Sequence, residues 1–227
     1  MKKLFKYFSK LEILLWLSSV FVILATFIAF DRENYLTLTA SLLGVTSLIL
    51  NAKGNPLGQL LMIIFSLLYG IISYTCAYYG EMITYLGMTM PMAVFALISW
   101  LKNPYSGNKS EVKINKLSKF EIILTLLITI IITIVFYFIL IFFDTSNIIP
   151  SIISVATSFL AVYFTFRRSS LFALAYAIND IVLIVLWILA SNVDIKYISV
   201  VVCFIAFLFN DIYCFINWQR IRKKQAN

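Results

Sequence analysis

The sequence predicts an all-α polytopic membrane protein with eight transmembrane helices. Of its 227 residues, 62% are hydrophobic and only 12% are charged. Apolar stretches of about 20 residues, the length that crosses a bilayer as a helix, recur along the whole chain. The weak alternation of β-barrel strands does not occur, and spanning segments must satisfy their backbone internally, so we expect helices throughout.

Short groups of turn and loop residues separate eight expected spans. The spans are 11–30, 36–50, 56–79, 82–101, 120–143, 147–166, 170–190 and 197–217. The first follows basic residues, as a signal peptide would. It has no small-residue cleavage site, however, so we interpret it as a retained anchor helix.

The basic residues predict the orientation of the chain. If the N-terminus lies inside, all of the 18 Lys and Arg residues except Arg32 and Lys196 fall in segments on the same side. By the positive-inside rule, both termini are then cytoplasmic and the protein lies in the cell membrane. The rule also explains the net charge of +8 without a nucleic-acid partner.

A weak internal repeat relates the two halves of the chain. Setting Trp100 on Trp218 also places Tyr79 on Tyr197 and Tyr69 on Trp187. Each repeat has three helices, so helix 120–143 is needed to make the repeats parallel, which is a known transporter plan. The expected parts are an N-terminal extra helix (1–35), a first repeat (36–101), a basic cytoplasmic loop with a linker helix (102–146), a second repeat (147–218) and a basic cytoplasmic tail (219–227).

Two Asn-Asp pairs, Asn179-Asp180 and Asn210-Asp211, lie deep in the last two apolar stretches. A charge at the bilayer centre costs about 2.5–3.5 kcal/mol on insertion scales, and an acid there is a candidate functional group. The helical rise places both acids near the middle or the inner half of the membrane. They could hold a polar or cationic ligand, or the four side chains could only join helices.

Aromatic and polar residues at similar depths complete the candidate site. Asn210, Tyr213 and Asn217 share one face of the last helix, and Tyr176 and Trp187 follow helical spacing around Asn179 and Asp180. The first repeat contributes Gln59, Tyr69, Tyr85 and Thr89. Such a set suits a flat, polar small molecule. Pro91 predicts a kink that is either a hinge for alternating access or a static bend.

The remaining polar residues have simpler interpretations. We expect three acids to be solvated at the outer ends of helices: Glu81, Asp144 and Asp194. We expect an interfacial belt of Trp16, Trp100 and Trp218. There is no His, and the three Cys residues have no metal-binding spacing. No catalytic motif or Gly-rich phosphate loop occurs, so we expect neither an enzyme nor a metal or other cofactor.

Three runs of sequence resemble the nicotinamide riboside transporter (PnuC) family. They are Tyr85-Leu-Gly-Met-Thr-Met-Pro with the later Ile-Ser-Trp100-Leu-Lys-Asn-Pro, Arg167-Arg168 with the later Ala-Leu-Ala-Tyr-Ala-Ile-Asn179-Asp180, and Asn210-Asp211-Ile-Tyr213-Cys-Phe-Ile-Asn217-Trp218. The resemblance covers roughly residues 36–220. It implies a fold like that of SWEET sugar transporters in full-length form, and an eighth helix that some members carry.

The resemblance also implies a function. Family members carry an unphosphorylated vitamin by facilitated diffusion, and a cytoplasmic kinase traps it inside the cell for NAD biosynthesis, without ATP or ion coupling. Many members carry Trp-x-x-Trp at the start of the penultimate helix, where the rings stack on nicotinamide riboside. Here 171–176 reads Leu-Phe-Ala-Leu-Ala-Tyr, so Phe172 and Tyr176 could stack instead.

Alternatives therefore stay open. Related groups in the same family carry thiamine or riboflavin. A membrane enzyme acting on a lipid and a structural subunit are the alternatives from other classes, and a homo-oligomer in the lipid bilayer is left open.

Overall fold

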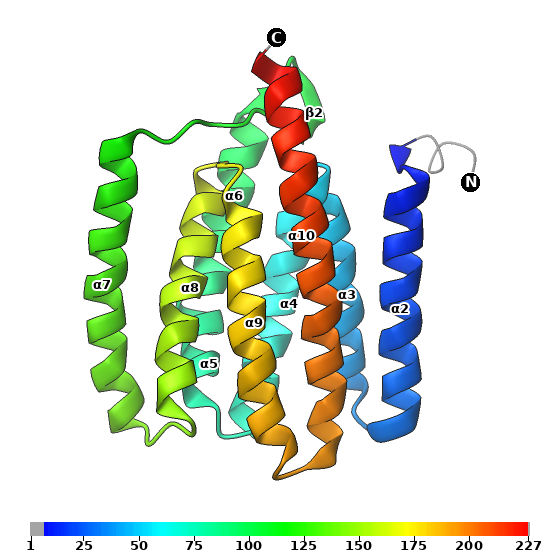
Figure 1. The fold of residues 1–227 in the computed structure, drawn as a ribbon, viewed down its shortest axis with the longest axis vertical. Helices are drawn as coiled ribbons and strands as arrows, with labels where there is room; N and C mark the ends of the chain where they lie inside the picture. The colour runs from blue at the N-terminus through cyan, green and yellow to red at the C-terminus, as the bar shows by residue number, and fades with distance from the viewer. Residues whose placement is uncertain (1–6, 227) are drawn as a thin grey trace.

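The computed structural model describes residues 7–226, most of which are helical (Figure 1). Eight helices in this part of the chain are long and apolar enough to cross a membrane, as the sequence predicts. The elements are α2 (Lys10–Phe30), α3 (Tyr35–Ala52), α4 (Leu57–Thr75), α5 (Tyr79–Ile83), the π-helix η1 (Thr84–Thr89), α6 (Met90–Lys102), α7 (Lys119–Phe142), α8 (Ile148–Phe166), α9 (Phe172–Ser191), the 3-10 turn η2 (Ile195–Tyr197) and α10 (Ile198–Ala226). Lys2, Lys3 and Lys6, which we placed on the cytoplasmic side, lie outside the described residues.

Two boundaries differ clearly from the expected spans. Helix α4 ends at Thr75 and not at 79, because Ala77 adopts a left-handed conformation (φ 57°) and the N–H groups of Cys76 to Tyr78 turn back onto α4 carbonyls. Helix α10 continues to Ala226, past the expected end at 217. Its polar last turns pack on the segment between α6 and α7, which supplies partners for Gln225.

The segment of helix around Pro91 is irregular. Pro91 lies inside the continuous apolar helix Tyr79–Lys102, two residues after a π-helical turn. A proline in a helix interior removes one backbone hydrogen bond and crowds the carbonyl four residues before it. The irregularity precedes it as the π-helical turn η1, Thr84–Thr89. Because π-turns occur frequently at functional sites, this stretch is a candidate for site geometry.

The two sets of three helices form the centre of the molecule. These sets are α3, α4 and α5–α6, and α8, α9 and α10; α2 and α7 lie at opposite edges (Figure 1). Only 11% of the most apolar stretch of α2 and of α7 is buried, compared with 33–56% for the other spans. Helix α2 packs on α10 and α3, while α7 packs mainly on α8.

Hydrogen bonds between the two sets occur in equivalent pairs. Trp100 Nε1 donates to the Thr165 carbonyl (2.9 Å), and Trp218 Nε1 donates to the Asn51 carbonyl (2.8 Å). The preceding residues repeat the pattern, since Ser99 Oγ donates to the Phe166 carbonyl and Asn217 Nδ2 donates to the Ala52 carbonyl. The last helix of each set therefore ends against the carboxyl end of the first helix of the other set.

The expected interfacial role is wrong for Trp100 and Trp218. Both side chains are fully buried, and their ring centroids lie 5.4 Å apart. Their indole N–H groups find acceptors inside the protein, so neither ring needs the membrane–water interface. Trp16 is only partly buried, and its Nε1 donates to Thr46 Oγ1 (3.1 Å).

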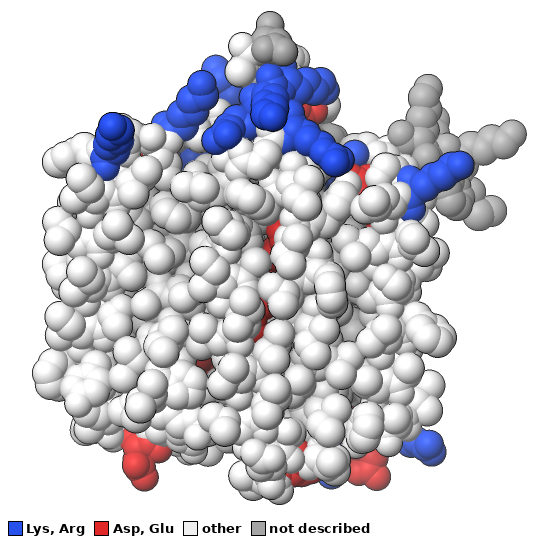
Figure 2. Space-filling view, in the orientation of Figure 1, with Lys and Arg blue, Asp and Glu red and all other residues white. Residues whose placement is uncertain are grey.

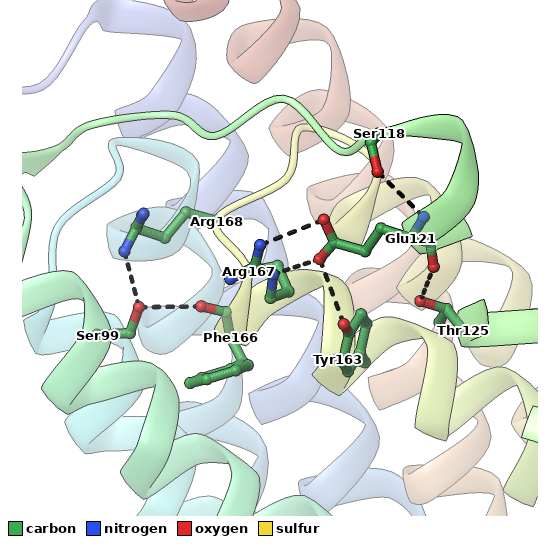
Figure 3. A network of polar contacts seen from close by, with 8 residues as sticks. All are labelled: Ser99, Ser118, Glu121, Thr125, Tyr163, Phe166, Arg167 and Arg168. Atoms are coloured by element: carbon green, nitrogen blue, oxygen red, sulfur yellow. Dashed lines mark hydrogen bonds and ion pairs between the residues drawn. The ribbon is translucent and has the colours of Figure 1, made fainter. Parts of the chain in front are cut away.

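Charged residues separate to the two ends of the bundle. Figure 2 shows Lys and Arg gathered at the end where the C-terminus lies, which we call the basic face, above a wide band with few charges. The opposite end, with the α2–α3, α4–α5, α7–α8 and α9–α10 connections, is the acidic face. Figure 3 shows how α7 is tied at the basic face, where Arg167 forms an ion pair with Glu121 that also accepts from Tyr163 OH.

The linker segment 103–118 is ordered across the basic face. It contains a hairpin of β1 (Pro104–Tyr105) and β2 (Asn108–Val112). At the end of β2 the N–H of Val112 donates to the Gly54 carbonyl, and beyond the hairpin the N–H of Asn115 donates to the Arg168 carbonyl, both at 3.0 Å. Gly54 and Arg168 hold the same left-handed position in the α3–α4 and α8–α9 turns (φ 68° and 54°). The linker segment thus bonds to the same turn in both repeats.

Candidate functional site

Asp180 on α9 and Asp211 on α10 line the same small cavity inside the bundle. Both are buried, at 3% and 1% exposure. Asp180 Oδ2 and Asp211 Oδ1 have no hydrogen-bond partner among the described residues. We call these two residues the acid pair. Buried carboxyl groups with free acceptor capacity are costly unless a ligand or a proton compensates them.

The acid pair lines a small central cavity between the two repeats. The cavity walls come from α3, α4, η1, α8, α9 and α10: Leu48, Met62, Phe65, Tyr85, Thr89, Ser158, Tyr176, Asn179, Asp180, Phe204, Phe207 and Asp211. None of these residues is basic. The cavity volume of about 20 Å³ is enough for a water molecule. The central cavity is therefore closed around its polar groups and must widen to admit an organic ligand.

Asn179 is oriented by α8. Its side-chain oxygen accepts hydrogen bonds from Thr157 Oγ1 (2.7 Å) and Ser158 Oγ (3.0 Å). Thr89, on the π-helical turn η1, reaches the same cavity, and its hydroxyl has no partner among the described residues. The Thr89 hydroxyl, like the acid pair, therefore has hydrogen-bonding groups that no other described residue uses.

Aromatic rings form much of the remaining wall. The Phe65 ring lies 6.0 Å from the Tyr85 ring and 5.4 Å from the Phe207 ring, measured between centroids. Sequence reasoning found Tyr85 and Tyr176 but missed Phe65, Phe204 and Phe207. A single Phe inside an apolar helix has no distinguishing signal, because its neighbours are equally hydrophobic.

Other predicted site residues have partners outside the central cavity. Tyr69 accepts a hydrogen bond from Trp187 Nε1, and both rings pack in the core on the acidic side of the cavity. Gln59 Nε2 donates to Asn51 Oδ1 (2.9 Å). Phe172 packs on the Trp218 ring, 4.6 Å away, toward the basic face. In this closed conformation the cavity is not lined by these four predicted residues: Tyr69, Trp187, Gln59 and Phe172.

The predicted polar face of α10 contacts other helices. Asn210 Nδ2 donates to Ser19 Oγ of α2 (2.9 Å), and Tyr213 OH donates to Glu12 Oε1 of α2 (2.9 Å). Asn217 bonds to α3, as described above. Consecutive helix residues point about 100° apart, so Asn210 faces α2 while Asp211 faces the cavity. The structure thus brings together Asn179, Asp180, Asp211, Tyr85, Thr89 and Tyr176 of the predicted set.

The expectation of a solvated Glu81 is wrong. Its side chain is fully buried, and neither carboxyl oxygen has a hydrogen-bond partner among the described residues. Helices α7 and α8 cover the start of α5, and a Cβ at Gly80 would clash with Leu140 of α7 at 2.6 Å. The first repeat therefore also contains a buried acid, contrary to expectation. Asp144 is exposed and Asp194 is partly exposed, as predicted.

Residues 34–220 match the family described as nicotinamide mononucleotide transporter. The chain belongs to this transporter family. It is 25% identical over 217 residues to the nicotinamide riboside transporter PnuC of Neisseria mucosa, covering 93% of this chain and 82% of that protein. The crystal structure of the vitamin B3 transporter PnuC superposes with a TM-score of 0.85 and 22% identity, covering 96% of this chain and 94% of that one.

Family membership determines the class of the protein. It is a multi-pass membrane transporter with the PnuC fold, and not an enzyme. Among residues 7–226, no group of three His, Cys, Asp or Glu side chains could hold a metal ion.

Proposed function

We propose that the protein carries nicotinamide riboside across the cell membrane by facilitated diffusion, and that the central cavity is its binding site. The observation that carries this proposal is the acid pair, which lies in an aromatic-lined cavity without a basic residue. A fixed positive charge on the ligand would compensate the buried carboxyl groups. The pyridinium ring of nicotinamide riboside is flat and carries such a charge.

The rest of the cavity suits the other parts of this molecule. Tyr85, Tyr176 and Phe65 line the cavity and supply aromatic rings that favour a cationic aromatic ring. The ribose hydroxyls and the carboxamide need hydrogen-bond partners, which the free Thr89 hydroxyl and Asn179 can supply. Thiamine has a positive charge as well, whereas riboflavin is neutral and gains nothing from the acid pair.

The acid pair also favours the riboside over its phosphorylated form. A phosphate group carries about two negative charges at neutral pH, and like charges in a buried site repel each other strongly. The proposed substrate is therefore the unphosphorylated vitamin. We assign the basic face to the cytoplasm by the positive-inside rule. A kinase there that phosphorylates the product would trap it inside and maintain the inward gradient.

Calorimetric titration of the purified protein tests the substrate. We expect nicotinamide riboside to bind and to raise the unfolding temperature, because a ligand that binds only the folded state stabilises it. Nicotinamide mononucleotide and riboflavin are expected not to bind. Equal binding of the riboside and its phosphate, or binding of none of the vitamins, would contradict the proposal.

Variants of the acid pair test the site. Asp180→Asn and Asp211→Asn are each expected to weaken riboside binding by about 10- to 100-fold, which corresponds to about 1.4–2.8 kcal/mol. Asp144→Asn, an exposed acid in the α7–α8 connection, is the control and should bind normally. If the two Asn variants bind normally but unfold at lower temperature, the acid pair only holds α9 and α10 together.

A further inference from the structure

A second, larger cavity opens at the acidic face. It has a volume of about 310 Å³ and lies between the α2–α3 connection, the end of α4 and the start of α10. We call it the outer vestibule. Three acids, Asp31, Glu33 and Asp194, line it together with a single basic residue, Lys196. The net charge of its lining therefore favours a cation, although the protein as a whole is basic.

Two buried polar groups face the outer vestibule. Asp31 is only 6% exposed; its burial raises the pKa of the carboxyl group, while the nearby charge of Lys196 lowers it. Thr37, on the first turns of α3, is 5% exposed, and its hydroxyl has no hydrogen-bond partner among the described residues. A buried, unpartnered hydroxyl in a cavity wall indicates a place where a polar ligand or water is held.

The outer vestibule continues inward toward the acid pair. A narrow cavity of about 10 Å³ lies below it and shares Thr37, Ile72 and Val200 with it. The narrow cavity in turn shares Phe65 and Phe204 with the central cavity. Three cavities are thus arranged in sequence from the acidic face to the acid pair.

Aromatic rings close this route at its narrowest point. Tyr69 packs against Phe204, with centroids 5.4 Å apart, and against Phe65 at 5.6 Å. Toward the basic face, the interior is filled by Trp100, Trp218 and Val112 of the linker segment, all nearly inaccessible. The acid pair is therefore separated from the acidic face by a few rings, and from the basic face by a packed core.

We infer that the outer vestibule is a first binding station for a substrate with a fixed positive charge, where Asp31, Glu33 and Asp194 hold the cation before it passes the rings around Tyr69. This inference rests on the proposed function. Charged clefts with low-dielectric walls focus the electrostatic field and raise the local concentration of a counter-ion. Lys196 opposes the acids and sets a limit on how tightly the cation is held, so that it can move on.

The chain contains its own reporter for this station. Cys76 lines the outer vestibule and is partly exposed, whereas Cys203 and Cys214 are buried. Burial raises the pKa of the Cys76 thiol, so its reactions are slowed. The raised pKa slows every thiol reagent equally. It therefore cancels in the ratio of labelling rates for two reagents of opposite charge, and this ratio reports the electrostatic potential inside the vestibule.

The test compares a cationic and an anionic methanethiosulfonate of similar size on the purified protein. We expect the cationic reagent to label Cys76 faster, by about tenfold at low salt, and the ratio to fall at high salt. Asp194→Asn and Glu33→Gln should each lower the ratio, while Asp144→Asn should not. Asn can keep the turn contact that Asp194 makes with the Lys196 N–H. Equal rates for both reagents would overturn the inference.

Transport measurements separate the station from the binding site. In proteoliposomes, Asp194→Asn is expected to raise the KM for nicotinamide riboside several-fold with kcat unchanged, because the acid pair is intact. An unchanged KM would overturn the station. The labelling ratio is measured without a transport substrate, so it tests the vestibule alone. If the proposed function is wrong, the titration shows no riboside binding, whatever the labelling ratio is.

Discussion

Two buried acids in the membrane region differ in their partners. Glu12 of α2 is 2% exposed and accepts hydrogen bonds from the Ser9 N–H and Tyr213 OH, with Lys53 Nζ at 3.5 Å. Glu81 is fully buried and has no hydrogen-bond partner among the described residues. The same residue type is therefore an ion-pair partner in one place and a packed side chain without a charged partner in the other.

This difference gives a prediction for stability. Glu12→Gln removes the charge that Lys53 and Tyr213 recognise, and hydrogen bonds to charged groups contribute about 1.5–3 kcal/mol. We expect a clear loss of unfolding free energy for Glu12→Gln and little loss for Glu81→Gln, which keeps the size of a side chain that has no charged partner. Thermal unfolding followed by tryptophan fluorescence measures both. A larger loss for Glu81→Gln would show that Glu81 is ionised and paired.

Individual site residues could be predicted from the sequence where burying the side chain in the membrane has a high free-energy cost. Asp180 and Asp211 stood out because acids are rare in apolar helices, and the structure places them together. Asn210 was grouped with Asp211 by adjacency, yet a helix sends neighbours to different faces. Glu81 was assigned to a loop end, since no sequence pattern shows that α7 and α8 will cover the start of α5.

Among the elements, the α3–α4 and α8–α9 turns show how the linker segment is held. Each turn presents the carbonyl of its left-handed residue to an N–H of the linker segment. Glycine adopts this conformation at Gly54, and Arg168 adopts it in the second turn with its guanidinium bonded to Ser99 Oγ (2.9 Å). Burial and the neighbouring Arg167 lower the pKa of Arg168.

Substitution of Gly54 tests the left-handed turn. Gly54→Ala is expected to destabilise the protein by about 1–2 kcal/mol, the usual penalty for a side chain in this conformation. A clash is not the reason, because the new Cβ would lie 3.4 Å from Val112 Cγ1, which is ordinary contact. Gly87→Ala is the control, because Gly87 lies in the π-helical turn without a left-handed φ and its new Cβ would only make ordinary contact with Ile83 Cγ2 at 3.9 Å; its unfolding temperature should not fall. Equal losses in both variants would contradict the role of the turn.

Element boundaries could be predicted only where local chemistry decides them. Apolar length identified all eight spans, and Ser118 before Glu121 marks the start of α7 as a helix cap would. The end of α4 depends on the unusual conformation of Ala77, which carries no sequence signal. The linker segment and the last turns of α10 contact each other through Gln225. Because each depends on the other, neither could be predicted from its own sequence alone.

At the scale of the whole molecule, equivalent contacts join the two sets of three helices. The carbonyls of Asn51 and Thr165 each accept one bond from their own turn and a second from a tryptophan of the other repeat. Trp100 and Trp218 also contact each other through their rings. Trp100 and Trp218, whose alignment first indicated a repeat in the sequence, are thus also in contact in the structure.

Because the contacts of Trp100 and Trp218 are equivalent, we expect the two residues to contribute similarly to the free energy of unfolding. Trp100→Phe and Trp218→Phe should each cost about 1–2 kcal/mol, because each removes one buried hydrogen bond and some packing volume. The double variant should lose less than the sum, since the two rings contact each other. Trp16→Phe, which affects a partly exposed ring, is the control with a smaller loss. Strictly additive losses from thermal unfolding would show that the two tryptophans act independently.

The number of spans was predictable because apolar stretches of membrane-crossing length can be counted along the sequence. Eight were expected, and the part of the chain that the structure describes has eight such helices. The closed state of the central cavity was not predictable, because it depends on how Phe65, Phe204 and Phe207 fill space. Sequence identifies that these residues are apolar, but only packing shows which of them separate the acid pair from the vestibule.

The bonds from α10 to α2 also constrain how the chain is assembled during its synthesis. Helix α2 leaves the ribosome first among the helices described here, and α10 leaves it last. Until α10 is made, Glu12 lacks Tyr213 and Ser19 lacks Asn210, so the earliest helix waits in the membrane with incomplete partners. Insertion of the final helix therefore completes the protein, and a nascent chain that stops before it would present an unfinished polar surface on α2 to cellular quality control.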